Sequence, residues 1–428
     1  MIEFHSIDEH KTAFAAALAA VPAALRQVYR RVARCFRITS ELAPGLFVVG
    51  GEVALTPAAA AANGAASMSA TGTGVSLAEA LTACLGETAE LLSQFERPGD
   101  IAELRPFADV APGEMVGTSG WIGSAFSVFH GSTVEANASL AWSRAHSLPV
   151  GSIVSVPSDY CFRRDPRQRL LDPVGALSSG CAAGPSLEAA AARAILELIE
   201  RDAAALWWYG GRPPCPVQGP ALVAGDELLV TLRQGLALRP TTFLDLTTDL
   251  GIPVMAAVSV DPDGRGLACG LGARLDPVDA LSAAIRELCQ MELSAPLALM
   301  KRQARGEAAL NASDRRHLQR TAFDTRGCAL LTATSTLSAT EVGRNVTGHK
   351  LILGPPLPDP GALFARLHVA GIRLLTLDLS RADIGVPVMR ALSPELQPFV
   401  SAPLTDRLSA AIARYGGGAL HTTGAPLI

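Results

Sequence analysis

Residues 177–202 read LSSGCAAGPSLEAAAARAILELIERD. Ser186, which follows Gly184-Pro185, is suited to cap a helix, because a serine oxygen can accept a hydrogen bond from a free backbone N–H of the first turn. Towards the end of this run, Glu197 and Glu200 stand three residues apart, so they share one face of the helix. The segment therefore predicts a long helix that presents two neighbouring carboxylates.

The same pattern occurs three times along the chain. Ser76 opens an apolar-periodic run 110 residues before Ser186, and Asp276, followed by Pro277, opens a third run. In each run, two side chains that carry oxygen follow the capping residue by eleven and fourteen positions, namely Glu87 and Glu90, Glu197 and Glu200, and Glu287 and Gln290. The repeat predicts three equivalent helices, each with one apolar face in the core.

Five glutamates brought together by such helices would repel one another unless cations lay between them. A single Glu-x-x-Glu is common on solvated helix faces, but three copies in one register are not. Oxygen ligands without histidine or cysteine favour Mg²⁺, which usually also binds the phosphates of a nucleotide. The repeat therefore favours a magnesium-dependent nucleotide site in which an arginine provides a further positive charge.

The composition excludes several other kinds of site. Only three of the 36 basic residues are lysines, and none of them directly follows a glycine, which excludes a P-loop. The net charge of −4 gives no general basic field for nucleic acid. The eight cysteines form no Cys-x-x-Cys pair and no His-Glu-x-x-His occurs, so we expect buried thiols rather than a zinc site or a disulfide scaffold.

A second repeat lies in the latter half of the chain. Leu244-Asp-Leu-Thr247 followed by Gly251-Ile-Pro-Val-Met255 recurs as Leu377-Asp-Leu-Ser380 followed by Gly385-Val-Pro-Val-Met389. Each copy follows a predicted helix, near 225–236 and 361–370, and predicts a strand, a turn and a second strand that begins at a proline. Asp245 and Asp378 are candidates for catalysis, but we favour a role in tying the turns. The repeats predict an α/β chain with internal symmetry.

The beginning of the chain predicts an N-terminal helix in a cytoplasmic protein. The apolar run 13–25 contains Pro22 and is too short to span a bilayer. Acidic residues precede it and arginines follow it, which is the reverse of the charge order in a signal peptide. The Pro- and Ala-rich stretch 57–66 is predicted to be a loop.

The segment that opens at Leu177 closely resembles the YcaO family. That family has Ser-Asn-Gly-x-Ala-Ala-Gly before a helix that ends in Glu-x-x-Glu-Arg-Asp, and here Ser179 stands in the Asn place. Gly86-Glu-Thr-Ala-Glu90 and Glu287-Leu-Cys-Gln290 are similar to the family's Gly-Glu-Ala-x-Glu and Glu-x-x-Gln segments. The resemblance implies a mixed α+β fold with internal pseudo-repeats and helices packed on largely antiparallel sheets. It places an ATP-binding catalytic domain at 61–428, after an N-terminal extension of helix and strand at 1–60.

The resemblance also implies roles for individual residues. In the family, glutamates hold Mg²⁺ against the phosphates of ATP. By position, the metal ligands are Glu87, Glu90, Glu197, Glu200 and Glu287. The expected nucleotide contacts are Ser179, Ser186, Glu87, Glu197, Arg201 and Gln290. Arg201 would act in catalysis as a cation beside the phosphates.

The implied activity is that of an ATP-dependent cyclodehydratase. A Cys, Ser or Thr side chain of a ribosomal precursor peptide attacks a backbone carbonyl carbon, the amide oxygen is phosphorylated, and the departure of phosphate leaves a thiazoline or oxazoline ring. Azoline-forming members often end in Pro-x-Pro-x-Pro, whose terminal carboxylate serves as a base, whereas this chain ends Gly424-Ala-Pro-Leu-Ile428. We expect the carboxylate of Ile428 to be catalytic, and a base from another source is the alternative.

The sequence contains no obvious segment that would hold a leader peptide. The resemblance therefore implies a multi-subunit complex with an adenylating-enzyme-like partner that binds the leader and a dehydrogenase that uses FMN to aromatise the rings. Such complexes make thiazole/oxazole-modified microcins, which are antibiotics. Thioamide formation with external sulfide and a non-catalytic scaffold role are the alternatives, and the intact glutamates favour catalysis. We expect no nucleic-acid or membrane partner.

Overall fold

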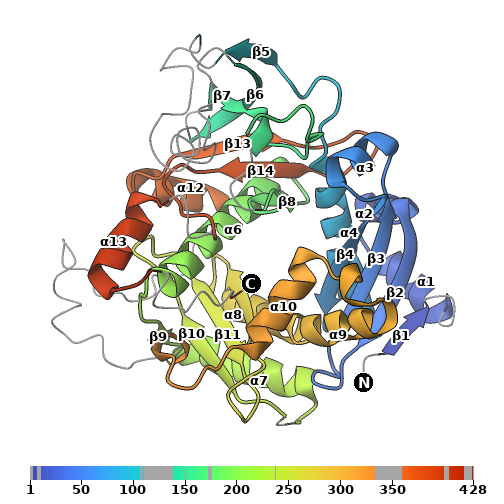
Figure 1. Cartoon of the computed structure of the whole chain (residues 1–428), viewed down its shortest axis with the longest axis vertical. Coiled ribbons are helices and arrows are strands. Elements are labelled where there is room, and N and C mark those ends of the chain that lie inside the picture. The colour runs from blue at the N-terminus through green and yellow to red at the C-terminus, as the bar shows by residue number, and fades with distance from the viewer. Residues whose placement is uncertain are drawn as a thin grey trace.

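Three antiparallel sheets and their helices are arranged around the centre of the molecule (Figure 1). The computed structural model describes residues 3–6, 11–106, 109, 138–149, 151–171, 176–236, 238–332, 359–399, 404–418 and 427. Every pairing between the named strands of this part is antiparallel. The predicted mixed α+β architecture on antiparallel sheets is thus confirmed.

The first sheet is built by the N-terminal part of the chain. Its strand order is β1 (Glu3–Ser6), β2 (Val32–Thr39), β3 (Phe47–Ala54) and β4 (Ser67–Gly74). The accompanying helices are α1 (Lys11–Ala20), α2 (Ala23–Val28), α3 (Pro57–Asn63) and α4 (Leu77–Ser93). β4 thus shares a sheet with strands that precede residue 60.

The predicted N-terminal helix is present but broken, and the predicted loop at 57–66 is wrong. The single N-terminal helix is interrupted between α1 and α2, at Val21 and Pro22, because proline lacks the N–H that a continuous helix needs. The stretch that we expected to be a loop contains α3. Thr56 caps this helix, Pro57 occupies its first turn, and the alanines that follow favour helix.

The second and third sheets come from the rest of the chain. The second has the order β12 (Ala268–Ala273), β11 (Val254–Ser259), β10 (Thr241–Asp245) and β9 (Cys215–Pro216). The third has the order β5 (Glu103–Pro106), β6 (Ser139–Leu148), β13 (Leu374–Asp378), β14 (Val388–Leu392) and β8 (Cys181–Ala183), with β7 (Ser152–Pro157) paired to β6. The helices are α6 (Leu187–Trp208), α7 (Gly219–Arg233), α8 (Pro277–Met291), α9 (Ser294–Arg305), α10 (Ala312–Ala322), α12 (Pro360–Val369) and α13 (Asp406–Tyr415).

The predicted strand–turn–strand repeat forms two matching hairpins, β10–β11 and β13–β14. Oδ1 of Asp245 accepts a hydrogen bond of 2.8 Å from the N–H of Thr247, and Oδ1 of Asp378 accepts one of 2.8 Å from Ser380. These are the turn-tying contacts that we favoured over catalysis. The helices expected before each copy are present as α7 and α12.

Each sheet ends in an edge strand that leads directly into a long helix: β4 into α4, β8 into α6, and β12 into α8. The predicted caps are confirmed, since Ser76, Ser186 and Asp276 each accept a hydrogen bond from a backbone N–H of the first turn. In a capping box the carboxylate of Glu79 would accept a hydrogen bond from the backbone N–H of Ser76. Here it accepts one from the N–H of Val75 instead. These three strand–helix units are called units 1, 2 and 3 below.

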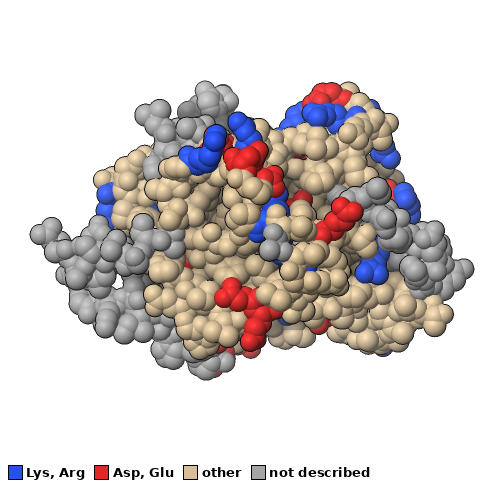
Figure 2. Space-filling model, turned by 90° about the horizontal axis from the view of Figure 1, so that it is seen from below, with Lys and Arg blue, Asp and Glu red and all other residues tan. Residues whose placement is uncertain are grey.

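α6 is the central helix of the structure. It packs against β8, β14 and β12, and its buried residues include Trp207 and Trp208. All eight cysteines are free, and five of them are buried. On the coloured part of the face in Figure 2, acidic and basic side chains form small separate groups on a mostly uncharged surface. No helix in the described part of the chain is long and apolar enough to cross a bilayer.

Candidate functional site

Glycines allow the edge strands to approach their helices very closely. A Cβ on Gly72 of β4 would lie 2.1 Å from the backbone nitrogen of Cys84 in α4. A Cβ on Gly272 of β12 would lie 2.3 Å from the carbonyl oxygen of Ala280 in α8. Only glycine permits such contact between a strand and a helix backbone. The close approach brings the side chains of each helix within reach of the backbone N–H groups of the strand.

The first residue of each oxygen-bearing pair binds the strand region of its own unit. Each carboxylate accepts a hydrogen bond from a backbone N–H: Glu87 from Thr71 at 2.7 Å, Glu197 from Gly180 at 3.1 Å, and Glu287 from Leu271 at 2.7 Å. Edge strands leave such N–H groups without a strand partner. The glutamates therefore satisfy the donors on the inner edges of the sheets.

The second polar residue of each helix binds the next unit. Glu90 of unit 1 accepts from the N–H of Ala183 in unit 2 at 2.7 Å, and Glu200 of unit 2 accepts from the N–H of Ala273 in unit 3 at 3.0 Å. Gln290 of unit 3 donates to Oγ1 of Thr71 in unit 1 at 2.9 Å. The hydrogen bonds thus close a cycle through the three units.

The structure therefore connects all five predicted metal ligands, of which Glu87 and Glu197 are also predicted nucleotide contacts, with Gln290, a further predicted nucleotide contact. We name this group the carboxylate ring, which consists of Glu87, Glu90, Glu197, Glu200, Glu287 and Gln290. Among the described residues, no hydrogen bond reaches the second carboxylate oxygen of Glu87, Glu90 or Glu287. Each of these glutamates is thus held by one oxygen, and the other is available to a ligand.

Arg201 lies beside the ring. Its Nη2 is 3.5 Å from Oε1 of Glu197 and 3.6 Å from Oε1 of Glu200. Burial alone would lower the pKa of Arg201, but the charges of Glu200, Glu197 and Glu287 raise it above its usual value. Its Nε is buried and has no hydrogen-bond partner in the described part of the chain. One guanidinium therefore offsets only part of the charge of five carboxylates.

The remaining charge is reduced by protonation. Burial raises the pKa of Glu87 to about 7 and that of Glu90 to about 8, and the repulsion of nearby carboxylates adds to the effect. Burial likewise raises the pKa of Glu287 to about 7 and moves the pKa of Glu197 upward. At neutral pH the ring without cations therefore retains protons, which a bound cation would displace.

The donor set fits a hard cation, although the carboxylates are not gathered around one point. Their oxygens suit Mg²⁺, and no histidine or cysteine is among them. Within the described ranges, no three acidic, His or Cys side chains are close enough to form a metal site as they stand. The free oxygens of the glutamates would have to turn toward a bound cation. The side chain of Glu197 remains 26% exposed, so a ligand can reach it.

The other predicted site residues lie at different distances from the ring. Ser179 directly precedes Gly180, whose N–H binds Glu197. Ser186 is occupied as the cap of α6, about 16 Å along the helix from Glu197 at 1.5 Å per residue. Ile428 lies outside the described residues.

The sequence interpretation missed several residues around the ring. Thr71 binds both Glu87 and Gln290. Gly72 and Gly272 each precede the capping residue of the following helix by four positions, and this spacing could have revealed the edge strands.

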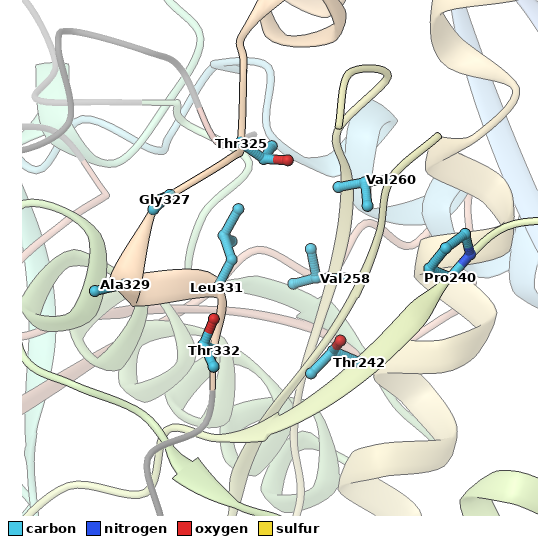
Figure 3. A pocket seen from close by; sticks show the side chains of 10 residues that line it. Pro240, Thr242, Val258, Val260, Thr325, Gly327, Ala329, Leu331 and Thr332 are labelled. Atoms are coloured by element: carbon cyan, nitrogen blue, oxygen red, sulfur yellow. The ribbon is translucent and has the colours of Figure 1, made fainter. Parts of the chain in front are cut away.

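Figure 3 shows a separate pocket of about 310 Å³. It is formed by β10, β11 and the segment 325–332, with Thr242, Val258 and Leu331 among its lining residues. None of the predicted site residues lines this pocket.

Comparisons with known proteins agree with this geometry. The family model described as "YcaO cyclodehydratase, ATP- and Mg²⁺-binding" matches residues 71–397. An uncharacterized protein of Methanothermobacter thermautotrophicus is 27% identical over 282 residues, which cover 64% of this chain and 69% of that protein.

Solved structures share the fold at low sequence identity. A heterocyclase in complex with substrate and cofactor has a TM-score of 0.68 and 22% identity over 92% of this chain, which spans only 55% of that heterocyclase. The YcaO protein from Methanopyrus kandleri bound with AMPPCP and Mg²⁺ has a TM-score of 0.56 and 20% identity, covering 88% of this chain and 91% of that one. The Escherichia coli microcin synthetase McbBCD complex has a TM-score of 0.57 and 14% identity, and the match covers 85% of this chain and 92% of that one. Because the family model covers most of the chain, the chain belongs to the YcaO family.

Proposed function

We propose that this chain is an ATP- and Mg²⁺-dependent cyclodehydratase that acts on the backbone of a ribosomal precursor peptide. The observation that carries the proposal is the cyclic carboxylate ring, in which five glutamates are held by backbone N–H groups from three units. Burying so many acidic groups is costly unless a cationic ligand is bound. A family described as binding ATP and Mg²⁺ agrees with such a ligand.

Each part of the site would have its own task. We assign the cations to Glu87, Glu90, Glu197, Glu200 and Glu287. One oxygen of each accepts a hydrogen bond from a backbone N–H, and the second oxygen does not. In Glu197 and Glu200 this second oxygen faces Arg201. Bound Mg²⁺ would neutralise phosphate charge as the phosphoryl group is transferred. Arg201 would place a further positive charge beside the phosphates. We assign nucleotide contacts to Gln290, Ser179 and Ser186. Ser179 lies just before β8, and Ser186 lies just after it.

The proposed reaction begins when a Cys, Ser or Thr side chain of the peptide attacks the preceding carbonyl carbon. The carbonyl oxygen accepts the γ-phosphoryl group of ATP, which leaves as ADP. The attack has already closed a five-membered ring, and the proton of the attacking thiol or hydroxyl goes to a base. Loss of phosphate then carries the former carbonyl oxygen away, and loss of the amide N–H proton to a base forms the C=N bond of the azoline. We assign the base to the carboxylate of Ile428.

We also propose partners for the reaction. The microcin synthetase that shares this fold is a complex of several subunits, and one of its structures has pro-MccB17 bound. We infer a precursor peptide, an adenylating-enzyme-like subunit that binds its leader, and an FMN-dependent dehydrogenase for this chain. The division into an extension at 1–60 and a catalytic domain at 61–428 remains part of this proposal.

The replacement Glu197→Gln tests the ring. Glutamine keeps an oxygen for the N–H of Gly180 but removes the negative charge, so the affinity for AMPPCP in the presence of Mg²⁺ should fall by about tenfold or more, which equals about 1.4 kcal/mol. Isothermal titration calorimetry measures this change. Glu188→Gln is the matched control, because Glu188 lies exposed on the same helix, and it should bind like the wild type.

Two outcomes would contradict the proposal. One is unchanged affinity in Glu197→Gln, and the other is equal loss in both variants. Mass spectrometry of the peptide product then identifies the chemistry, since ring closure removes one water per ring whereas thioamide formation replaces oxygen with sulfur.

A further inference from the structure

A pocket of about 340 Å³ lies where the end of α4 meets the turn of the second hairpin, β13–β14. Much of its wall is apolar, since Leu55, Leu92, Phe95 and Ile384 line it together with alanines of α3. Its volume is near the lower end of the about 300–1,000 Å³ that small-molecule pockets occupy. The pocket can therefore hold a short apolar group.

Two arginines and one aspartate stand at the mouth of this pocket. Nη2 of Arg31 lies 2.9 Å from Oδ2 of Asp383, and Nη1 of Arg97 donates to Oδ1 of the same residue. The three side chains are between 36% and 47% exposed. Each guanidinium has five N–H donors, and among the described residues the two side chains bind only this aspartate. Their other donors are available to a second acceptor.

The matching turn of the first hairpin, β10–β11, has the opposite balance of charge. Asp249 and Asp383 occupy equivalent places, because each lies two positions before a glycine of its turn. At the first turn, one arginine, Arg407, binds both Asp249 and Asp202. One cation thus serves two carboxylates there, whereas two cations serve one carboxylate at Asp383. The second turn can accept one more carboxylate.

The other acidic residue that lines the pocket is already bound. Glu96 lies 2.6 Å from Nε of Arg164, and this arginine also binds Asp159. At the mouth, the hydrogen bond from Arg97 and the charges of both arginines lower the pKa of Asp383, although partial burial opposes them. The mouth therefore favours the ionised form of a carboxyl group.

We propose that this pocket binds a small carboxylic acid with an apolar tail, whose carboxylate lies between Arg31 and Arg97 and whose tail packs on the apolar wall. Guanidinium groups suit carboxylates because they form charge-assisted, often bidentate, hydrogen bonds. The wall favours a tail of several carbons, since burial removes apolar surface from water. No residue of the carboxylate ring lines the pocket, so this site is separate from the proposed nucleotide site.

Hexanoate, hexanamide and acetate test the chemistry of the site, and ligand-observed NMR titrations measure their dissociation constants. Hexanoate should bind the wild type with a dissociation constant of about 1 mM or less. Hexanamide lacks the charge and acetate lacks the tail, so each should bind at least about tenfold more weakly. Equal binding of hexanoate and either of the other two compounds would overturn the proposal.

Two substitutions at the mouth should act in opposite directions. Arg97→Met removes a cation and should weaken hexanoate binding at least about fivefold, whereas Asp383→Asn removes a competing negative charge and should strengthen it about threefold. Arg34→Met is the matched control and should bind like the wild type, because Arg34 is an exposed arginine that pairs with Glu52 outside the pocket. Circular dichroism checks that each variant is folded.

A substitution in the wall tests where the tail lies. Ala59 lines the pocket, and Ala59→Phe should weaken hexanoate binding at least about tenfold because the larger side chain occupies the space of the tail. Unchanged binding in folded Arg97→Met and Ala59→Phe would show that hexanoate binds elsewhere and would overturn the proposal. A wild type that binds the tripeptide Gly-Gly-Leu but not hexanoate would overturn the assignment to a free acid.

Discussion

The ring glutamates show how one residue type can serve both structure and ligand binding. One oxygen of Glu87 accepts from the N–H of Thr71, whereas its other oxygen receives no hydrogen bond from the described residues. The backbone hydrogen bond favours the carboxylate form, but burial and the neighbouring carboxylates favour the protonated form more strongly. The result is an acid that responds to a cation near neutral pH.

This balance predicts that Mg²⁺ affinity depends on pH. Because the pKa is raised to about 8 for Glu90 and to about 7 for Glu87 and Glu287, cations must compete with protons below these values. Mg²⁺ alone should bind more tightly at about pH 8.5 than at about pH 6, and its binding should release protons. Calorimetry in two buffers with different ionisation enthalpies measures both quantities.

Glu90→Gln supplies the control for this titration, because the neutral side chain has no proton to release. The number of protons released at about pH 7 should therefore be smaller in this variant. Equal Mg²⁺ affinity at both pH values, without proton release, would show that the ring glutamates are already ionised.

At the scale of elements, the strand–helix unit depends on glycine where the backbones meet. In unit 1, Gly72 lies against α4, and in unit 3, Gly272 lies against α8. The contact sets the distance from which a glutamate can reach an edge N–H. A shift of either helix away from its strand would therefore lower the stability of the fold and also lengthen the hydrogen bonds that hold the ring glutamates.

Gly72→Ala is the corresponding prediction. The new Cβ would lie 2.1 Å from a backbone nitrogen of α4, so the strand and helix must separate, and we expect the free energy of unfolding to fall by about 3 kcal/mol or more. Gly86→Ala is the matched control. A Cβ there meets nothing within 4 Å, and alanine in the interior of α4 should raise the free energy of unfolding by about 0.5–1 kcal/mol. Denaturant titration measures both, and equal effects would contradict the role of the contact.

At the scale of the whole molecule, the ring joins units that are far apart in the sequence. Glu90 and Ala183 are 93 residues apart, and Gln290 and Thr71 are 219 residues apart. A ligand held by the ring would therefore contact all three units at once. Outside the ring, Arg407 of α13 makes a further long-range tie, because it bonds both Asp202 of α6 and Asp249 in the turn of the first hairpin.

Nucleotide binding should accordingly protect the three units together. AMPPCP with Mg²⁺ at about 100 times its dissociation constant should stabilise the protein by about 2.7 kcal/mol. Hydrogen–deuterium exchange should slow in β4, β8 and β12 alike, since their N–H groups are held by glutamates that bind the ligand. Glu188→Gln should show the same protection. Protection confined to one unit would mean that the ring does not act as one site.

Much of the fold followed from local patterns. The caps at Ser76, Ser186 and Asp276, the carboxylate pairs on their helices, and the turns at Asp245 and Asp378 depend on residues only a few positions apart, so spacing was enough to predict them. The loop predicted at 57–66 was wrong because successive alanines favour helix and Pro57 lies in the first turn, where proline is tolerated.

The sequence alone established three equivalent helices with paired oxygens and no P-loop, because helical periodicity and caps are local. Only the tertiary structure decided that Glu90, Glu200 and Gln290 reach into the next unit. These contacts depend on which sheet edges meet at the centre of the molecule. Spacing along the chain does not encode that arrangement, because it arises from the packing of three sheets around shared helices.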